Sequence, residues 1–321
     1  MMMDLIKAFE DMGHTVLVVK AHEIEDMVAN NVPGETILQA FAGVFLEPKC
    51  DFIFGYGAVP LIGLRMKDRG VVNLFEELKL PYLSIYYDSP MHSIPFEAEY
   101  SAYYSRLHYR FIWDRYYSDE MQNLGFANVH YMPIGTNTRR YKKLDERAAE
   151  LSGFQHDVSF VGNWSVRREI VIRKLMPFNP VIYGVNWDQK ARGDIKQLYR
   201  RKVDNVTELP FIYNYSKVNI NTTMEQGISS LNMRIFDVIA CEGFLITDYK
   251  KDLEELFDIE KEIVCYRHVD ELPGLVGYYL EHEDERKTIA RAARRRALRE
   301  HSYKNRAEFI LNILRADGIG V

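Results

Sequence analysis

A regular alternation of short β-branched or aromatic runs with longer segments of helical period constrains this sequence most. Parallel strands need a crossover connection, usually a helix, so the alternation predicts βαβ units and parallel sheets. Two such series follow one another, which predicts an α/β protein with two Rossmann-like, doubly wound domains. The predicted strands are Thr15–Val19, Asp51–Phe54, Tyr82–Tyr87, Arg110–Trp113 and Val129–Met132, then Asp157–Val161, Val181–Val185, Lys217–Asn221, Phe244–Thr247 and Glu262–Tyr266.

The helical segments and a polar stretch between the two series predict the domain organisation. Helices are expected at Val71–Leu80, Arg167–Leu175, Asn232–Cys241 and Leu253–Asp258, and residues 271–316 read as wholly helical. The boundary is placed so that residues 1–145 form an N-terminal domain and residues 146–321 a C-terminal domain with a helical tail. Two such domains facing each other form a cleft, in which ligands bind at the carboxyl ends of the strands.

Composition narrows the class of protein. The 321 residues carry a net charge of −5, which gives no general electrostatic reason to bind nucleic acid. No apolar run approaches the length of a membrane span, and three cysteines are too few and scattered for a disulfide framework. We therefore expect a cytoplasmic protein. The basic stretch from Arg286 to Arg299 is flanked by acidic residues and is typical of a solvated helix face, with peripheral contact to anionic lipid headgroups as the alternative.

Several motifs are absent from the sequence. It contains no P-loop, CxxC, HExxH, GxSxG or Asp-x-Asp pattern, so we expect neither a metal nor a bound cofactor. The stretch from Gly55 to Pro60 follows a predicted strand like a dinucleotide-binding loop, but Pro60 stands where the third glycine is needed.

The most informative segment runs from Ser229 to Asp248. Ser229 or Ser230 is predicted to cap a helix whose first turn holds Asn232 and Arg234. A helix N-terminus binds phosphate through its free N–H groups, and a guanidinium group adds a bidentate partner. Asp237, one turn later, is placed to accept hydrogen bonds from ribose hydroxyls. The alternative is an ordinary capped helix with a surface Arg–Asp pair.

A second turn has similar properties. The predicted strand Asp157–Val161 runs into Gly162 and Asn163, and Arg167 and Arg168 open the next helix. Backbone amides and guanidinium groups then meet at the carboxyl edge of the sheet, where an anion would bind. The alternative is a βα turn with two solvated arginines.

These segments resemble the glycosyltransferases related to the spore maturation protein CgeB. The resemblance covers most of the chain in the expected order. It lies in Phe160-Val-Gly-Asn, in the stretch from Asn232 to Asp248, in Leu253-Glu-Glu-Leu-Phe, Tyr278-Tyr-Leu-Glu-His and Glu300–Arg306, and in the N-terminal half in Pro81–Pro90 and Phe111–Asp114. It implies a GT-B fold in which the C-terminal domain binds a nucleotide-diphosphate sugar and the acceptor lies mainly against the N-terminal domain.

The resemblance also implies roles for individual residues. Arg234 would hold the donor diphosphate, Asp237 the ribose, and Asn163 and Arg168 the other side of the phosphates. Many retaining GT-B enzymes carry two glutamates separated by seven residues, and Ser229 and Asp237 occupy those positions here. Retention of configuration therefore does not follow from the resemblance.

The amino-terminal region also departs from the family pattern. Family members usually open with a strand and a glycine-bearing loop ahead of the first helix, whereas this sequence opens inside that helix. Either the first strand is absent from the protein or the sequence starts downstream of it.

Glycosyl transfer needs positive charge on the leaving diphosphate and, in inverting enzymes, a base for the acceptor hydroxyl. Asp88, after the strand Tyr82–Tyr87, is the first candidate base, with a turn or cap before Pro90 as the alternative. His92 is the second candidate. We therefore expect a metal-independent glycosyltransferase acting on a glycan, lipid-linked or protein acceptor. A nucleotide-sugar epimerase and a non-catalytic nucleotide- or sugar-binding protein are the alternatives.

Overall fold

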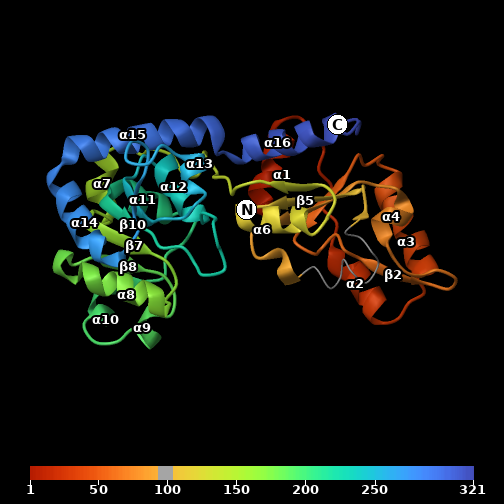
Figure 1. Cartoon of the computed structure of the whole chain (residues 1–321), viewed down its shortest axis with the longest axis horizontal. Coiled ribbons are helices and arrows are strands. Elements are labelled where there is room, and N and C mark those ends of the chain that lie inside the picture. Colours follow the sequence, from red (N-terminus) through yellow and green to blue (C-terminus); the bar gives the residue numbers. More distant parts are fainter. Residues whose placement is uncertain (93–103) are drawn as a thin grey trace. The chain divides into compact units, whose positions relative to one another are not determined.

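The computed structural model describes residues 1–92 and 104–321, which group into two compact units (Figure 1). The first unit contains residues 1–133, 226–230 and 306–321, and the second contains residues 134–225 and 231–305. This division differs from the predicted one, because it falls at residue 133 and returns two later segments to the first unit. The segments return because residues 226–230 bond to the first unit's Asp114, and Phe309 packs on its Phe111.

The first unit is built on a four-stranded parallel sheet of order β1-β4-β5-β6. Its helices and strands are α1 (Met2–Asp11), α2 (Ala21–Ala29), α3 (Gly34–Leu46), β1 (Ile53–Tyr56), β2 (Gly63–Met66), β3 (Gly70–Asn73), α4 (Leu74–Leu78), β4 (Tyr82–Tyr86), η1 (Pro90–His92), β5 (His108–Ile112), α6 (Arg115–Asn123), β6 (Val129–Tyr131) and most of α16 (Tyr303–Ala316). The strands β4 and β5 are buried along their whole length, as expected for the centre of a parallel sheet.

The second unit is built on a six-stranded parallel sheet of order β12-β11-β10-β7-β8-β9. Its elements are α7 (Arg147–Ser152), β7 (His156–Val161), α8 (Val166–Leu175), η3 (Met176–Phe178), β8 (Val181–Tyr183), α9 (Trp187–Lys190), α10 (Ile195–Leu198), β9 (Tyr199–Arg201), α11 (Leu209–Tyr215), β10 (Ser216–Ile220), α12 (Met233–Ala240), β11 (Leu245–Asp248), α13 (Leu253–Leu256), β12 (Val264–Tyr266), η4 (Val269–Glu271), α14 (Leu272–Glu281) and α15 (Glu283–Glu300).

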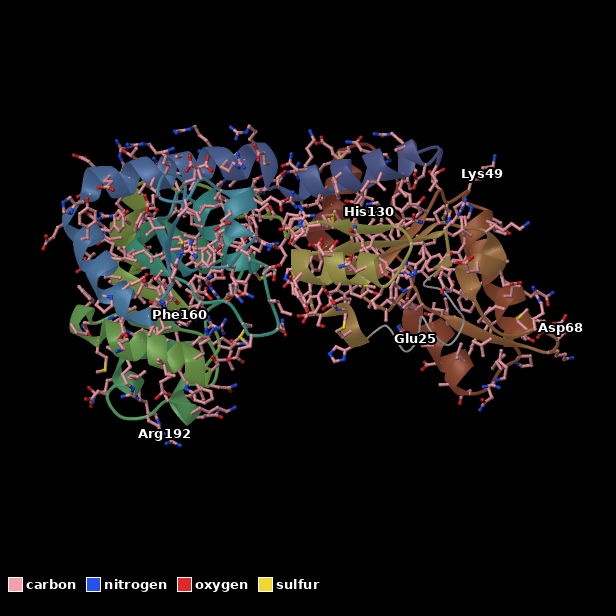
Figure 2. All side chains as sticks on the ribbon, in the orientation of Figure 1. Glu25, Lys49, Asp68, His130, Phe160 and Arg192 are labelled. Atoms are coloured by element: carbon pink, nitrogen blue, oxygen red, sulfur yellow. The ribbon has the colours of Figure 1, made fainter. Side chains whose placement is uncertain are left out.

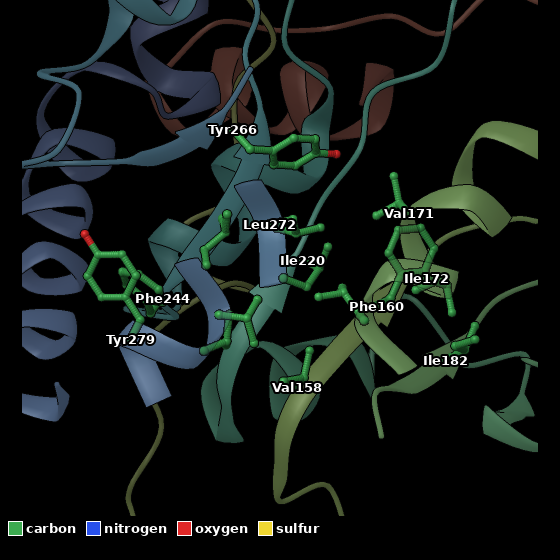
Figure 3. Packing of buried hydrophobic residues seen from close by; sticks show 14 of the residues in the cluster. Val158, Phe160, Val171, Ile172, Ile182, Ile220, Phe244, Tyr266, Leu272 and Tyr279 are labelled. Atoms are coloured by element: carbon green, nitrogen blue, oxygen red, sulfur yellow. The ribbon is translucent and has the colours of Figure 1, made fainter. Parts of the chain in front are cut away.

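Apolar side chains of the sheet and of the helices packed against it form the core of this unit. Phe160 and Ile220 of the sheet pack with Ile172 of α8 and Leu272 of α14 in one buried cluster (Figure 3). The helices α11 and α12 also contact strands of this sheet. The first strand of the unit, β7, lies in the middle of the sheet, between β10 and β8.

Nine of the ten predicted strands are present, although their ends shift by up to two residues. The predicted strand Thr15–Val19 was wrong, because these residues form no strand in the structure. Their β-branched run has the right composition, but among the described residues nothing pairs with it. The structure also adds the β2–β3 hairpin and β9, which the sequence pattern did not indicate.

Two helical predictions need correction. The predicted helix Val71–Leu80 begins only at Leu74, because residues before it pair with β2 and the Asn73 side chain caps the helix by accepting the Phe75 N–H at 2.8 Å. The predicted helical tail is confirmed, but it is divided into α14, α15 and α16 by breaks at His282 and at His301–Ser302. No helix among the described residues combines the length and the apolar character needed to span a bilayer.

Candidate functional site

Polar side chains gather where β7, β10 and β11 end, and we call this end of the six-stranded sheet the carboxyl edge. Gly162 and Asn163 follow β7, Asn221 follows β10, and Asp248 is the last residue of β11. Strands in a parallel sheet finish at the same edge, so residues distant in the sequence meet there. The sequence analysis predicted the first two of these residues as site residues and missed the other two.

Arg168 reaches this edge from the first turn of α8. Ser165 caps that helix by accepting the Arg168 N–H at 3.3 Å, and the Arg168 side chain turns inward until it is only 5% exposed. Its guanidinium donates to the backbone oxygens of Asn163 at 2.8 Å and Thr222 at 3.4 Å, while its buried Nε has no protein partner. A buried guanidinium with a donor left over is suited to an anionic ligand.

Arg234 reaches the same edge from the first turn of α12. Its Nη1 donates to Oδ1 of Asn221 at 2.5 Å, and Asn232 donates to the same oxygen at 3.0 Å. The Oδ1 atom of Asn232 is buried and has no hydrogen-bond partner. Asn221 therefore fixes the direction of the Arg234 side chain, and its own side-chain amide is held by Thr247 at 2.8 Å.

The two arginines converge on one aromatic ring. The guanidinium carbons of Arg168 and Arg234 each lie 5.9 Å from the ring centre of Phe160, which is buried in the second unit (Figure 2). Burial, and then the positive charge of Arg234, lower the pKa of Arg168 to about 10. A buried guanidinium and a half-buried one beside the same ring favour a ligand that carries at least two negative charges.

Two glycines allow the turns after β7 and β8 to lie close to each other and to Arg234. A Cβ atom on Gly162 would lie 3.2 Å from Nη2 of Arg234 and 3.1 Å from the Phe160 ring. A Cβ atom on Gly184, which has a φ of +150°, would lie 2.0 Å from the Gly162 oxygen. The predicted site residue Gly162 is thus at the closest approach of the β7 turn to Arg234.

Arg167 lies at the same edge but has a different environment. Its Nη2 pairs with Asp248 Oδ2 at 3.1 Å, and its side chain is 42% exposed. Asp248 also accepts the Thr223 N–H at 2.9 Å and the Thr223 hydroxyl at 2.6 Å. Arg167 therefore has a carboxylate partner in the protein, whereas Arg168 and Arg234 donate to the neutral oxygens described above.

Asp237 lies one turn after Arg234 and is 6% exposed. Its Oδ1 accepts the Thr136 hydroxyl at 2.7 Å. This contact ties α12 to the segment that opens the second unit. The predicted contact between Asp237 and a ribose stays a prediction, and the surface-pair alternative is wrong because the carboxylate is buried.

Ser229 and Ser230 do not cap α12 as predicted. The residue before the first helical turn is Asn232, and both serines belong to the first unit. The Ser229 hydroxyl donates to Oδ1 of Asp114 at 2.7 Å, and the backbone N–H groups of Ile228, Ser229 and Ser230 point to the same carboxylate. Asp114 is fully buried, so its charge attracts these donors more strongly than the end of a neutral helix does.

Asp88, the first candidate base, is exposed and follows β4. Its carboxylate accepts the hydroxyl of Tyr56 and, at 2.6 Å, the side-chain amide of Gln226. This arrangement replaces the predicted turn or cap before Pro90 as the alternative explanation for the residue. His92 ends the short helix η1 and is also exposed.

A cavity of about 860 Å³ in the first unit has Tyr56 in its wall. Most of its lining is apolar, including Val28, Val32 and Leu61, and its charged members include Glu35. The Oε2 atom of Glu35 is buried and has no hydrogen-bond partner. The residue that orients Asp88 therefore also borders an apolar cavity with an available hydrogen-bond acceptor.

Within the described residues, no group of His, Cys, Asp and Glu side chains is arranged to hold a metal ion. The expectation of metal-independent chemistry stays a prediction.

Comparison with known proteins identifies the fold and a family model that matches part of the chain. A family model described as glycosyl transferase-like matches residues 167–312. Among solved structures, a glycosyltransferase from Rickettsia africae has a TM-score of 0.63 at 11% identity and covers 97% of this chain and 87% of that one. HepE of Anabaena in complex with UDP has a TM-score of 0.62 at 11% identity, with coverage of 88% and 82%.

The curated relative supplies the more specific match. Spore protein CgeB of Bacillus subtilis is 25% identical over 190 residues, which are 53% of this chain and 56% of that protein. The chain has the GT-B fold of these glycosyltransferases, and about half of it is similar in sequence to CgeB. The predicted resemblance to CgeB and the predicted GT-B fold are thereby confirmed. The match spans little more than half of the length of CgeB.

Sequence reasoning missed Asn221, Asp248 and Asp114 as residues that organise the GT-B framework. Asn221 and Asp248 each follow or end a predicted strand, and that position is a usable signal in a parallel sheet. Asp114 carried the weaker signal of an N-cap, since it accepts the Tyr116 N–H at 3.0 Å. Its bonds to residues 228–230 join positions more than 110 residues apart, and no local pattern predicts them.

Proposed function

We propose that this protein transfers a sugar from a nucleotide-diphosphate donor whose diphosphate binds at the carboxyl edge of the second unit. The observation that carries the proposal is the pair of guanidinium groups of Arg168 and Arg234 over Phe160. Burial and the charge of Arg234 disfavour the charged form of Arg168, and a bound diphosphate would offset both effects. The leaving nucleoside diphosphate develops negative charge at the same place, so the pair would also stabilise the transition state.

The N-terminus of α12 supports this assignment. Met233 and Arg234 lie in its first turn, where backbone N–H groups lack helical acceptors and the helix dipole is positive. Asn232 places an unpaired side-chain oxygen beside them, which is suited to a hydroxyl of the donor sugar or ribose. Asp237, in the next turn, is the proposed ribose ligand, reached by displacing or sharing the Thr136 hydroxyl.

For the acceptor, we propose the cavity bordered by Tyr56. An acceptor with an apolar body would fill it, and its hydroxyl would lie beside Asp88, the proposed base for an inverting reaction. This chemistry favours the lipid-linked class among the glycan, lipid-linked and protein acceptors that the sequence left open. Enlarging Ala58 in the cavity wall to Leu should raise the acceptor KM and leave donor binding unchanged.

The test is product analysis with a panel of nucleotide-diphosphate sugars, in the presence of a lipid extract as the acceptor source. A transferase releases the nucleoside diphosphate and labels an acceptor, whereas an epimerase changes the sugar without an acceptor. Arg234→Ala should abolish turnover, while Arg192→Ala, an exposed arginine of the same unit, should retain it (Figure 2). Binding of a donor with no turnover under any condition would instead identify a non-catalytic binding protein.

A further inference from the structure

The helix α15 of the second unit, which is 18 residues long, carries its charges unevenly. Its first turn holds Glu283, Asp284 and Glu285, whereas residues 286–299 include seven Arg or Lys residues and no acidic one. The helix dipole favours acids in the first turn and cations in the last turn, but its effect falls off within those turns. The cations in the middle of α15 therefore need another explanation.

Three of the seven cations attach α15 to the rest of the second unit. Arg286 donates to a backbone carbonyl oxygen of α14, Arg294 to one of α12 at 3.3 Å, and Arg296 to one of α13 at 3.1 Å. The side chains of Arg294 and Arg296 are only 30% and 23% exposed. These three arginines have partners within the unit and a structural role.

The other four cations follow one another at intervals of four residues, and we call them the basic row: Lys287, Arg291, Arg295 and Arg299. Residues four apart lie on the same side of a helix, and this row extends for about 18 Å. All four side chains are exposed, and Figure 1 shows α15 along the outside of the second unit. The opposite side of the helix carries its buried apolar residues, Ile289, Ala290, Ala293 and Ala297.

The basic row is only partly neutralised by the protein. The cations at its two ends each pair with a glutamate of the same helix, at 2.6 and 2.7 Å. Arg291 donates to the Thr288 hydroxyl oxygen at 3.1 Å, and neither it nor Arg295 has a carboxylate partner among the described residues. Like charges four residues apart destabilise a helix, so an anionic partner would stabilise α15 at this row.

An apolar side chain accompanies the basic row. Leu298 lies on the same side of the helix, between Arg295 and Arg299 in the chain, and is 42% exposed. A nucleic acid would bind the cations but gain little from an exposed leucine. A lipid bilayer binds both, because apolar side chains and the stems of arginines enter the boundary between headgroups and acyl chains.

We propose that the basic row and Leu298 dock the second unit on an anionic lipid bilayer, with α15 parallel to its surface. The guanidinium groups of Arg291, Arg295 and Arg299 contact headgroup phosphates, and Leu298 enters the acyl boundary. The acids of the first turn lie at the other end of the helix, away from these contacts. This docking goes beyond the proposed transfer reaction, in which α15 takes no part.

The test measures sedimentation of the full chain with phosphatidylcholine vesicles, with and without phosphatidylglycerol. Neither donor nor acceptor is added, so the outcome is independent of the proposed transfer reaction. We expect binding only to the anionic vesicles, and its loss in about 1 M salt, where the Debye length is about 3 Å.

A pair of double variants locates the surface. Arg291→Gln with Arg295→Gln should weaken vesicle binding about 25-fold, because each cation near an anionic surface contributes about fivefold. The matched control, Arg192→Gln with Lys196→Gln, removes two exposed cations of the same unit and should bind as the parent does. Equal binding to neutral and anionic vesicles, or an equal loss in the two double variants, would overturn the proposal.

A further variant separates a bilayer from other polyanions. Leu298→Gln should weaken vesicle binding about fivefold, because a partly exposed leucine no longer enters the bilayer. The same change should leave the weak binding of single-stranded RNA unaltered. Unchanged vesicle binding in Leu298→Gln, or tighter binding of the parent protein to RNA than to anionic vesicles, would contradict docking on a bilayer.

Discussion

The two parallel sheets of this chain differ in where their first strand lies. In the second unit, the first strand, β7, lies in the middle of the sheet, and the Gly162 turn that follows it lies at the proposed donor site. In the first unit, the first strand, β1, pairs with β4 alone among the described residues and borders a cavity of about 460 Å³. The comparison indicates that the proposed donor site depends on its central strand, β7. The turn that follows this strand determines how closely the chain approaches the N-terminus of α12.

The largest expected effect concerns the close contact between the β7 and β8 turns. Gly184→Ala places a Cβ atom 2.0 Å from the Gly162 oxygen at a positive φ, so we expect destabilisation of about 4 kcal/mol. Hydrogen exchange during denaturant unfolding should show the loss in the second unit. Gly274→Ala, in α14 with open space around it, is the matched control and should be neutral or stabilising. Similar losses in the two variants would contradict the account.

The next effect falls in the first unit. Asp114→Ala removes the buried carboxylate that holds the N–H groups of residues 228–230 and the Ser229 hydroxyl, at an expected cost of about 3 kcal/mol. Exchange should accelerate at residues 226–230 and at the start of α6. Asp119→Asn changes an exposed acid on the same helix and should alter neither. Unchanged protection of residues 226–230 in Asp114→Ala would show that this segment is held by other contacts.

A pH dependence distinguishes the centre of the first sheet. Burial, and then the charge of Arg110, keep the pKa of His108 well below its usual range, and the ring lies 2.9 Å from the Ser84 hydroxyl. The unfolded chain binds a proton near pH 6.5 while the folded chain does not, so stability falls as the pH drops below that value. The slope from this group is at most about 1.4 kcal/mol per pH unit.

The control for this effect is His108→Gln, which can keep a hydrogen bond to Ser84 and does not titrate. Between pH 7.5 and 5.5, the free energy of unfolding should fall by about 1 kcal/mol more in the parent protein than in the variant. Parallel pH curves for the two proteins would remove His108 from the explanation.

The smallest effect is expected from Arg167→Ala, and it tests whether Arg167 and Arg234 have different roles at the carboxyl edge. Arg167 is partly exposed and paired with Asp248, so Arg167→Ala should cost less than about 1 kcal/mol of stability. Its effect on the affinity for a nucleoside diphosphate should be a few-fold at most. A loss as large as that from Arg234→Ala would show that Arg167 leaves Asp248 to contact the phosphates.

The sequence pattern predicted the parts of the structure that follow from local periodicity. The central strands β4, β5, β7 and β10 are rich in β-branched and aromatic residues, and the Ser165 cap marks the start of α8. The segment Thr15–Val19 shows the limit, because its composition is that of a strand but a strand also needs a neighbour. The β2–β3 hairpin was missed because its strands are short and β3 overlaps the predicted helix Val71–Leu80.

The residues of the candidate site were also predicted only in part. The sequence located Gly162, Arg168 and Arg234 by their place at the ends of strands and the starts of helices. It did not reveal that Phe160 lies under both guanidinium groups, or that Asn221 orients one of them. Nor did it reveal the attachment of Ser229 to Asp114. These relations join residues far apart in the chain, and only the folded sheet brings them together.

The most direct test of the central claim is the affinity of the purified protein for a nucleoside diphosphate and for the corresponding nucleoside, measured by calorimetry. The donor base comes from a prior screen of uridine, guanosine, thymidine and adenosine diphosphates. Arg234→Ala should weaken the diphosphate by about 1.5–3 kcal/mol, or about 10- to 150-fold, and leave the nucleoside and the Arg192→Ala control unchanged. An unchanged affinity for the diphosphate in a folded Arg234→Ala protein would contradict the placement of the diphosphate at the carboxyl edge.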